Sequence, residues 1–243
     1  MALIENAKGR RPDQPPSGYT RLFGIEALGN LLSRVQGAVI SAGNELETLI
    51  WERVTQIEDL DVFVATTIHQ RTPGMFVARK QQVKKSKSIN SRYEPDFVGF
   101  DLEHRICYVV EVKDGDQFDT KKAGSEYVTL HNFTNDISHA LPFSTRIFIC
   151  SFNATTKGEV LRGLKGRFAI GEVLTGREFC ELFQIDYDEI RRSRDRDQER
   201  NLEFFVRELL RIEPLRSLIR RRLKADTEAP EETPPPALDV APR

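Results

Sequence analysis

The sequence predicts an α/β fold, with α+β as the alternative, in which helices flank a central mixed β-sheet. Apolar residues recur at helical spacing near both ends of the chain, strand-like apolar runs fill its middle, and a helical segment separates two such runs. Elements in this order pack in layers around one core. With 243 residues, of which 39% are hydrophobic and 30% charged, the chain is long enough to bury that core without disulfides.

The N-terminal elements are expected to be helical. Apolar residues recur every three or four positions from Ile25 to Val39, which predicts a first helix. Ser41-Ala42-Gly43 predicts a break, and Asn44 is suited to cap a second helix over about 45–57. Residues 62–68 are rich in β-branched side chains, so we expect a strand there.

The middle of the chain is expected to supply the sheet. Residues 97–100 and 106–113 predict two strands joined by a short polar turn. A helix is expected over 127–141, and residues 146–152 form a nearly continuous apolar run, which is typical of a strand buried on both faces. Residues 168–174 are a further candidate strand. The remaining segments have helical spacing: 177–184, 187–213 and a basic helix after Pro214.

Composition also predicts how the chain is divided. Residues 1–18 are polar and contain three prolines, so we expect a flexible arm. Residues 225–243 contain five prolines and five acids against one base, which predicts a disordered tail. Residues 19–224 contain no linker rich in Gly, Ser or Pro, and we expect them to form a single domain.

Several classes of protein are excluded. The chain has 36 basic and 37 acidic residues, so any anionic partner must meet a local patch rather than a bulk polycation. Uncharged stretches are about half the roughly 20 residues that a membrane helix needs, and no Walker A motif for a nucleotide cofactor is present. Cys107, Cys150 and Cys180 form no CxxC pair, and we expect buried thiols in a reducing cytoplasm.

The strands over 97–100 and 106–113 carry the most informative residues. If the hairpin turns tightly at Glu103-His104, the antiparallel register places Asp96 opposite Glu111, whereas another turn would shift that register. Side chains alternate along a strand, so Lys113 shares the face of Glu111. Two close carboxylates repel unless a cation lies between them, and a hard divalent metal ion does this well. The alternative interpretation is a solvent-facing strand edge with alternating charges.

The spacing Pro95-Asp96, fourteen residues, Glu111-Val112-Lys113 resembles the active-site motif of the PD-(D/E)XK nuclease superfamily, whose best-known members are type II restriction endonucleases. The resemblance covers about residues 44–152 and implies a restriction-endonuclease-like core with Mg²⁺ as cofactor. It implies that Asp96, Glu111 and the Val112 carbonyl are metal ligands and that Lys113 positions the attacking water.

Glu47 is a further catalytic candidate. The superfamily often has an acid on a helix before the first core strand, and Glu47 shares a helical face with Ile50, Trp51 and Val54. The alternative is an acid in the first turn of a helix, where the helix dipole favours it.

A basic run leads into the proposed site. Residues 71–92 contain seven bases and no acid, and such residues can contact DNA phosphates. A solvated flexible loop is the alternative. The residues predicted to bind DNA are Arg79, Lys80, Lys84, Lys85, Lys87 and Arg92.

Together these features predict a Mg²⁺-dependent, sequence-specific endonuclease that resembles a type II restriction enzyme and hydrolyses phosphodiester bonds of double-stranded DNA. A palindromic target would require a two-fold homodimer, so we expect one. A repair, recombination or transposition nuclease of the same superfamily is one alternative. A DNA-binding protein without catalysis is another.

Overall fold

The computed structural model describes residues 2–9, 11, 14–115 and 120–228. The described residues form two compact units, one within 2–3 and 38–198 and the other within 4–37 and 199–228. Of the predicted tail, residues 229–243 lie outside the described residues, and 225–228 end a helix. No helix in the described part of the chain is long and apolar enough to span a membrane.

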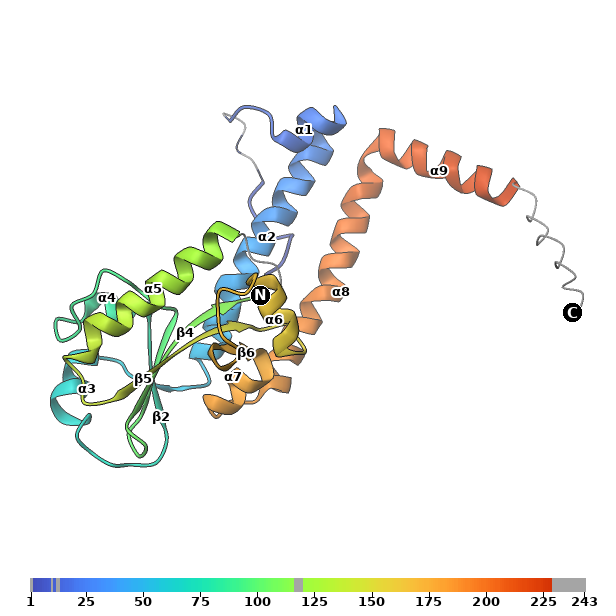
Figure 1. Ribbon diagram of the computed structural model, residues 1–243. Coiled ribbons are helices and arrows are strands. Elements are labelled where there is room, and N and C mark those ends of the chain that lie inside the picture. The colour runs from blue at the N-terminus through green and yellow to red at the C-terminus, as the bar shows by residue number, and fades with distance from the viewer. Residues whose placement is uncertain (1, 10, 12–13, 116–119, 229–243) are drawn as a thin grey trace, which may run out of the picture. The chain divides into compact units, whose positions relative to one another are not determined.

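The first unit is built on a mixed sheet, as the sequence predicted (Figure 1). Within the described residues the sheet has six strands in the order β1-β2-β3-β4-β5-β6. The pairs β2–β3 and β3–β4 are antiparallel, and β1–β2, β4–β5 and β5–β6 are parallel. The strand bounds are Thr55–Gln56 (β1), Met75–Arg79 (β2), Phe97–Asp101 (β3), Ile106–Lys113 (β4), Ser144–Ser151 (β5) and Val173–Thr175 (β6).

Helices cover both faces of this sheet. One core packs the sheet against α3 (Leu60–Thr66), α5 (Thr120–Ser138) and α6 (Lys157–Gly163). The opposite core packs it against the end of α2 (Glu26–Trp51) and α7 (Gly176–Leu182). Because side chains alternate along β4, its two sets of residues enter different cores, which gives three layers and explains why the central strands are apolar on both sides.

The hairpin between β3 and β4 has the predicted register. Asp101 pairs with Ile106 and Phe97 with Val110, so the next step of the ladder sets Asp96 opposite Glu111. Asp101 accepts a hydrogen bond from the backbone N–H of His104 at 2.9 Å, and Arg105 adopts a positive φ of 59°. The polar turn therefore fixes the pairing of both strands.

Two N-terminal predictions are wrong. Helix α2 continues through 41–43 without a break, because one glycine costs a helix only about 1 kcal/mol and the buried side chains of Leu46 and Ile50 hold its end on the sheet. Residues 62–68, predicted as a strand, lie largely in α3. Asp59 caps that helix by accepting hydrogen bonds from two backbone N–H groups, and Leu60 and Phe63 are buried at helical spacing.

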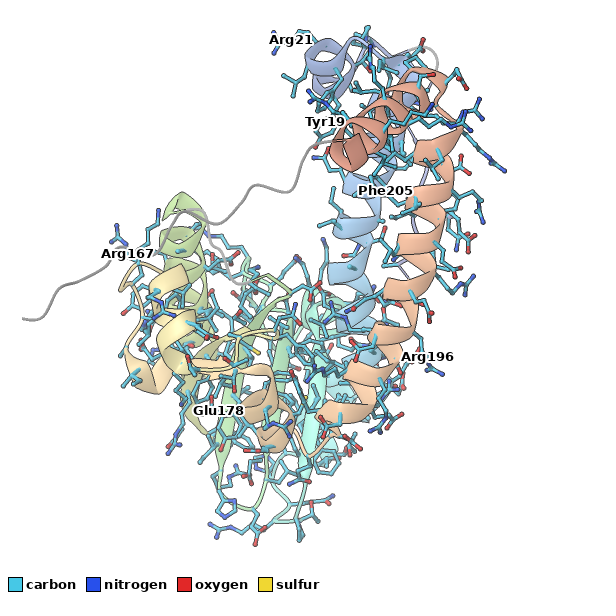
Figure 2. All side chains as sticks on the ribbon, turned by 90° about the vertical axis from the view of Figure 1, so that its right-hand side faces the viewer. Tyr19, Arg21, Arg167, Glu178, Arg196 and Phe205 are labelled. Carbon is cyan, nitrogen blue, oxygen red and sulfur yellow. The ribbon has the colours of Figure 1, made fainter. Side chains whose placement is uncertain are left out.

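Other elements differ from the sequence interpretation at their ends. The basic run contains β2 and then a short helix, α4 (Lys80–Lys85), rather than being one loop. Of the candidate strand over 168–174, only its end belongs to β6, which follows the 3₁₀ turn Ile170–Glu172. Glu178, labelled in Figure 2, belongs to the capping box that starts α7, in which Thr175 is the N-cap.

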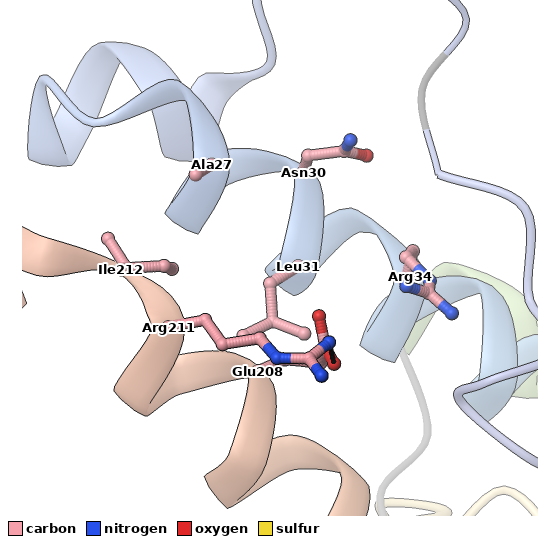
Figure 3. Close-up of a pocket in the computed structure, with 7 residues that line it drawn as sticks. All are labelled: Ala27, Asn30, Leu31, Arg34, Glu208, Arg211 and Ile212. Carbon is pink, nitrogen blue, oxygen red and sulfur yellow. Dashed lines mark hydrogen bonds and ion pairs between the residues drawn. The ribbon is translucent and has the colours of Figure 1, made fainter.

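The second unit contains α1 (Gly18–Phe23), part of α2, part of α8 (Tyr187–Arg211) and α9 (Glu213–Glu228). Arg34 donates hydrogen bonds to the carbonyls of Ile4, Glu5 and Ala7 and stacks on Phe204. A cavity of about 280 Å³ lies within this unit (Figure 3). Its lining residues are Ala27, Asn30, Leu31, Arg34, Glu208, Arg211 and Ile212.

Candidate active site

Two carboxylates are buried side by side where β3 begins and β4 ends. Asp96, directly before β3, is 8% exposed, and Glu111 in β4 is 7% exposed. The Asp96 Oδ2 atom accepts a hydrogen bond of 2.9 Å from the backbone N–H of Val112. This bond ties the start of β3 to the end of β4, so the backbone itself sets how the two acids approach each other.

The Lys113 ammonium lies between carboxylates from two elements. Its Nζ atom contacts Glu111 Oε1 on the same face of β4, as strand alternation predicted, and lies 3.1 Å from Glu126 Oε1 of α5. The three side chains are 9–32% exposed. The lysine therefore balances part of the negative charge that the strands bring together.

Burial and mutual repulsion change the acidity of this cluster. Burial, and then the charge of Asp96, raise the pKa of Glu111 to about 8. Burial also raises the pKa of Asp96 to about 6 and outweighs the hydrogen bond from Val112, which acts to lower it, while the charge of Glu47 adds a smaller upward contribution. Burial acts to lower the pKa of Lys113, but the attraction of Glu111 and Glu126 outweighs it and raises that pKa. Lys113 is thus charged, and a bound cation would stabilise the ionised forms of Asp96 and Glu111.

Glu47 on α2 belongs to the same electrostatic cluster. Burial and the charge of Glu111 raise the pKa of its carboxyl, whereas Lys80, Lys113 and Arg79 act to lower it. The side chain is half-buried, and Leu46 and Ile50 beside it are buried. The structure thus brings all four predicted catalytic residues into one charge network.

The donor set of the cluster fits a hard divalent cation. Two buried carboxylates with raised pKa values gain most from a positive charge between them, and their oxygens are ligands that Mg²⁺ prefers. Among the residues that the structure describes, no group of three acidic, histidine or cysteine side chains is close enough to hold a metal ion alone. A bound cation would therefore take further oxygens from the backbone, such as the predicted Val112 carbonyl, or from water and substrate.

The basic residues nearest the acids lie where β2 ends and α4 begins. The backbone N–H of Lys80 donates a hydrogen bond of 3.1 Å to the Asp96 carbonyl. The Arg79 guanidinium lies 4.7 Å from the centre of the Trp51 ring. Lys80 and Lys84 place their Nζ atoms 3.8 and 3.4 Å from the carboxylate of Glu94, two residues before Asp96. One end of the basic run thus adjoins the acidic cluster.

The other predicted DNA contacts lie further along the run and are exposed. Lys85 ends α4, and the backbone N–H of Lys87 is held by the Asp61 carboxylate. Hydrogen bonds from Ser86 and then from this loop lower the pKa of Asp61. Arg92 donates to the Tyr93 hydroxyl at 2.7 Å. Among the described residues, Arg79 and Lys80 are the predicted DNA contacts whose charges act on the acidic cluster, and Lys84 reaches only Glu94 beside it.

A polar network holds Asp114 and Gly115, directly after Lys113. Asp114 forms an ion pair with Arg194 of α8, and Asn153 after β5 donates to both the carbonyl and the carboxylate of Asp114. Ser151 donates to the Gly115 carbonyl at 3.0 Å. The ends of β4 and β5 are therefore joined by side chains as well as by the sheet.

Sequence reasoning missed Glu126 and Glu94. Glu126 lies on the helical face of Ala123, Leu130 and Phe133, all three of which are fully buried. An acid on an apolar stripe was the signal that identified Glu47, and the same signal was present in α5. Glu94 stands next to the Pro95-Asp96 pair, but nothing in the sequence indicated that it would pair with lysines of α4.

The chain is similar to a characterised protein over most of its length. It is 41% identical over 227 residues to the type II restriction enzyme HhaII of Haemophilus parahaemolyticus, an alignment that covers 91% of this chain and 99% of the relative. No protein-family model matches the chain. No solved structure matches it.

Proposed function

The chain belongs to the type II restriction enzymes, and on that premise we propose that it is a Mg²⁺-dependent endonuclease that hydrolyses double-stranded DNA at a specific sequence. We also assign it to the PD-(D/E)XK superfamily. The observation that carries the proposal is the buried pair Asp96 and Glu111, with the Lys113 ammonium against Glu111. An unreactive strand rarely buries two acids and a base, because such groups must be desolvated.

Each residue of the cluster has a chemical role in this proposal. A divalent cation, when bound, lowers the pKa of water and neutralises charge on the phosphate under attack. Asp96, Glu111 and the Val112 carbonyl would hold the cation. The Lys113 ammonium positions the attacking water and stabilises the negative charge that develops on the phosphate. Glu47 adds negative charge on the α2 side of the site and accepts a proton or a hydrogen bond from water there.

DNA reaches the site along the basic run. Phosphate contacts from Arg79, Lys80 and Lys84 place the scissile bond near Asp96, because α4 starts directly beside that residue. Lys85, Lys87 and Arg92 extend the positive surface along the duplex. Their contribution is affinity for phosphate that depends on salt rather than on base sequence.

Glu94 competes with DNA phosphate for two of these lysines. We expect Glu94→Gln to bind non-cognate duplex about two- to fivefold more tightly, because exposed ion pairs are each worth about 0–1 kcal/mol. Fluorescence anisotropy across a salt series measures this effect. Glu103→Gln, in the exposed turn between β3 and β4, removes the same charge from the far end of the hairpin. An equal gain in both variants would show that only net charge matters.

The same proposal covers assembly and place of action. A two-fold homodimer would present one site to each strand of a palindromic target. We propose that the enzyme acts in the cytoplasm, where the buried Cys107, Cys150 and Cys180 stay reduced. The chemistry needs no nucleotide cofactor.

Digestion of a large unmodified phage DNA tests the function. With Mg²⁺ we expect discrete fragments, and with a chelator we expect intact DNA. A smear that needs Mg²⁺ would favour a repair or recombination nuclease without sequence specificity. If a broad panel of linear and branched DNAs is bound but stays intact, a DNA-binding protein without catalysis is the better description.

A further inference from the structure

We propose that Glu126 is a positioning residue for the Lys113 ammonium. Its Oε1 atom lies 3.1 Å from Lys113 Nζ, and the two side chains are 22% and 32% exposed. This inference rests on the proposed function, because it describes how the lysine is held during DNA cleavage. It adds to the proposed site a residue that belongs to a different element, α5, which packs on the sheet face that carries Glu111 and Lys113.

Stability alone does not explain an acid at this place. Glu126 lies on the face of α5 that also presents Ala123, Leu130 and Phe133 to the core. An apolar side chain there would extend the packed face, whereas a partly buried ion pair gives little net stability because both charges lose water. The carboxylate is explained by what it contacts, which is the ammonium of Lys113.

The hydrogen-bonding capacity of the ammonium gives the contact a role. A lysine ammonium has three N–H donors in a tetrahedral arrangement. Contacts with Glu111 and Glu126 use two of them and so fix the direction of the third. A lysine held at only one carboxylate can rotate about its flexible side chain. Its ammonium then spends less time in the position that catalysis needs.

The carboxylates of Glu111 and Glu126 have different roles in the proposed site. Glu111 is a proposed cation ligand, so its attraction for Lys113 weakens when a divalent ion is held there. Glu126 is not a proposed ligand and keeps its full charge for the lysine. We therefore infer that Glu126 keeps the Lys113 ammonium beside the reacting phosphate while Glu111 binds the cation.

Glu126→Gln tests the inference in the full-length protein. We expect the single-turnover cleavage rate to fall about 10- to 100-fold, while the Kd for duplex and the Mg²⁺ concentration for half-maximal rate stay within about twofold. In a Lys113→Ala background the same change should cost no further rate. Asp136→Asn, an exposed acid ten residues along the same helix, is the matched control and should cleave normally.

A second readout does not depend on cleavage. In metal-free protein, a lysine-selective ¹H–¹⁵N spectrum should show an NH₃⁺ signal for Lys113, assigned by its loss in Lys113→Ala. That signal should shift or broaden in Glu126→Gln and stay unchanged in Asp136→Asn. An unchanged signal in Glu126→Gln, an additive rate loss in the double variant or a tenfold change in Mg²⁺ requirement would each overturn the inference. If Glu126→Gln changes the signal but the wild type cuts no DNA, the proposed function fails instead.

Discussion

Lys113→Ala should lose DNA cleavage by a factor of about 10³ or more while keeping its affinity for duplex within about threefold. Groups that stabilise charge developing in a transition state each contribute about 10²–10³ in rate, and Lys113 also orders its neighbours. Without the ammonium, the repulsion between Glu111 and Glu126 loses the positive charge that lies between them. Single-turnover cleavage and anisotropy binding, measured on one substrate, separate these two effects.

Lys157→Ala is the matched control for that loss. Lys157 pairs with Glu178 at 3.3 Å and is 31% exposed, close to the 32% of Lys113. Both variants remove one half-buried lysine from one or more ion pairs, so a general loss of stability would affect them alike. Equal cleavage rates in the two variants would contradict a catalytic role for Lys113.

Glu111→Gln should make the metal-free protein more stable at pH 8 while abolishing cleavage. Burial, and then Asp96, raise the pKa of Glu111 to about 8, so the folded chain binds this proton more tightly than the unfolded chain does. Stability of the wild type therefore falls as pH rises from about 4.5 towards 8. Glutamine carries no charge at any pH, so the variant lacks the contribution of Glu111 to this loss of stability. The variant's gain in stability over the wild type is therefore absent near pH 4 and largest at pH 8.

Thermal unfolding across this pH range, with chelator present, measures the effect. We expect a gain of roughly 1 kcal/mol or more at pH 8, and each kcal/mol raises the Tm of a chain of this length by about 2–4 °C. Glu159→Gln should instead lose stability at pH 8. Hydrogen bonds from Thr155 lower the pKa of Glu159, so its charged form favours the folded state. A loss of stability at pH 8 in both variants would mean that the charge of Glu111 is not destabilising.

The sequence was most informative where short-range rules determine structure. A tight turn at Glu103-His104, assumed from the sequence, predicted the Asp96–Glu111 register, and the observed pairing of Asp101 with Ile106 confirms that turn. The mixed sheet and most helices followed from periodicity. The acids stood out because a charged residue in a strand buried on both faces needs a partner.

The parts that were mispredicted or missed depend on tertiary contacts. Residues 62–68 look like a strand by composition, but the Asp59 cap and burial of Leu60 and Phe63 make most of them helical. The break at 41–43 does not occur because packing of α2 on the sheet outweighs one glycine. Glu126 lies thirteen residues beyond Lys113 in another element, and sequence spacing gave no register between them.

Binding of Mn²⁺, as a paramagnetic substitute for Mg²⁺, tests most directly whether the buried acids form a cation site. Electron paramagnetic resonance counts the free ion as it is titrated into the wild type and into an Asp96→Asn/Glu111→Gln double variant. Glu103→Gln/Asp136→Asn removes two exposed acids and controls for net charge. We expect the wild type and the control to bind Mn²⁺ alike, and the Asp96/Glu111 variant to lose that binding. Equal binding by all three proteins would contradict the assignment of Asp96 and Glu111 as the cation ligands of a nuclease.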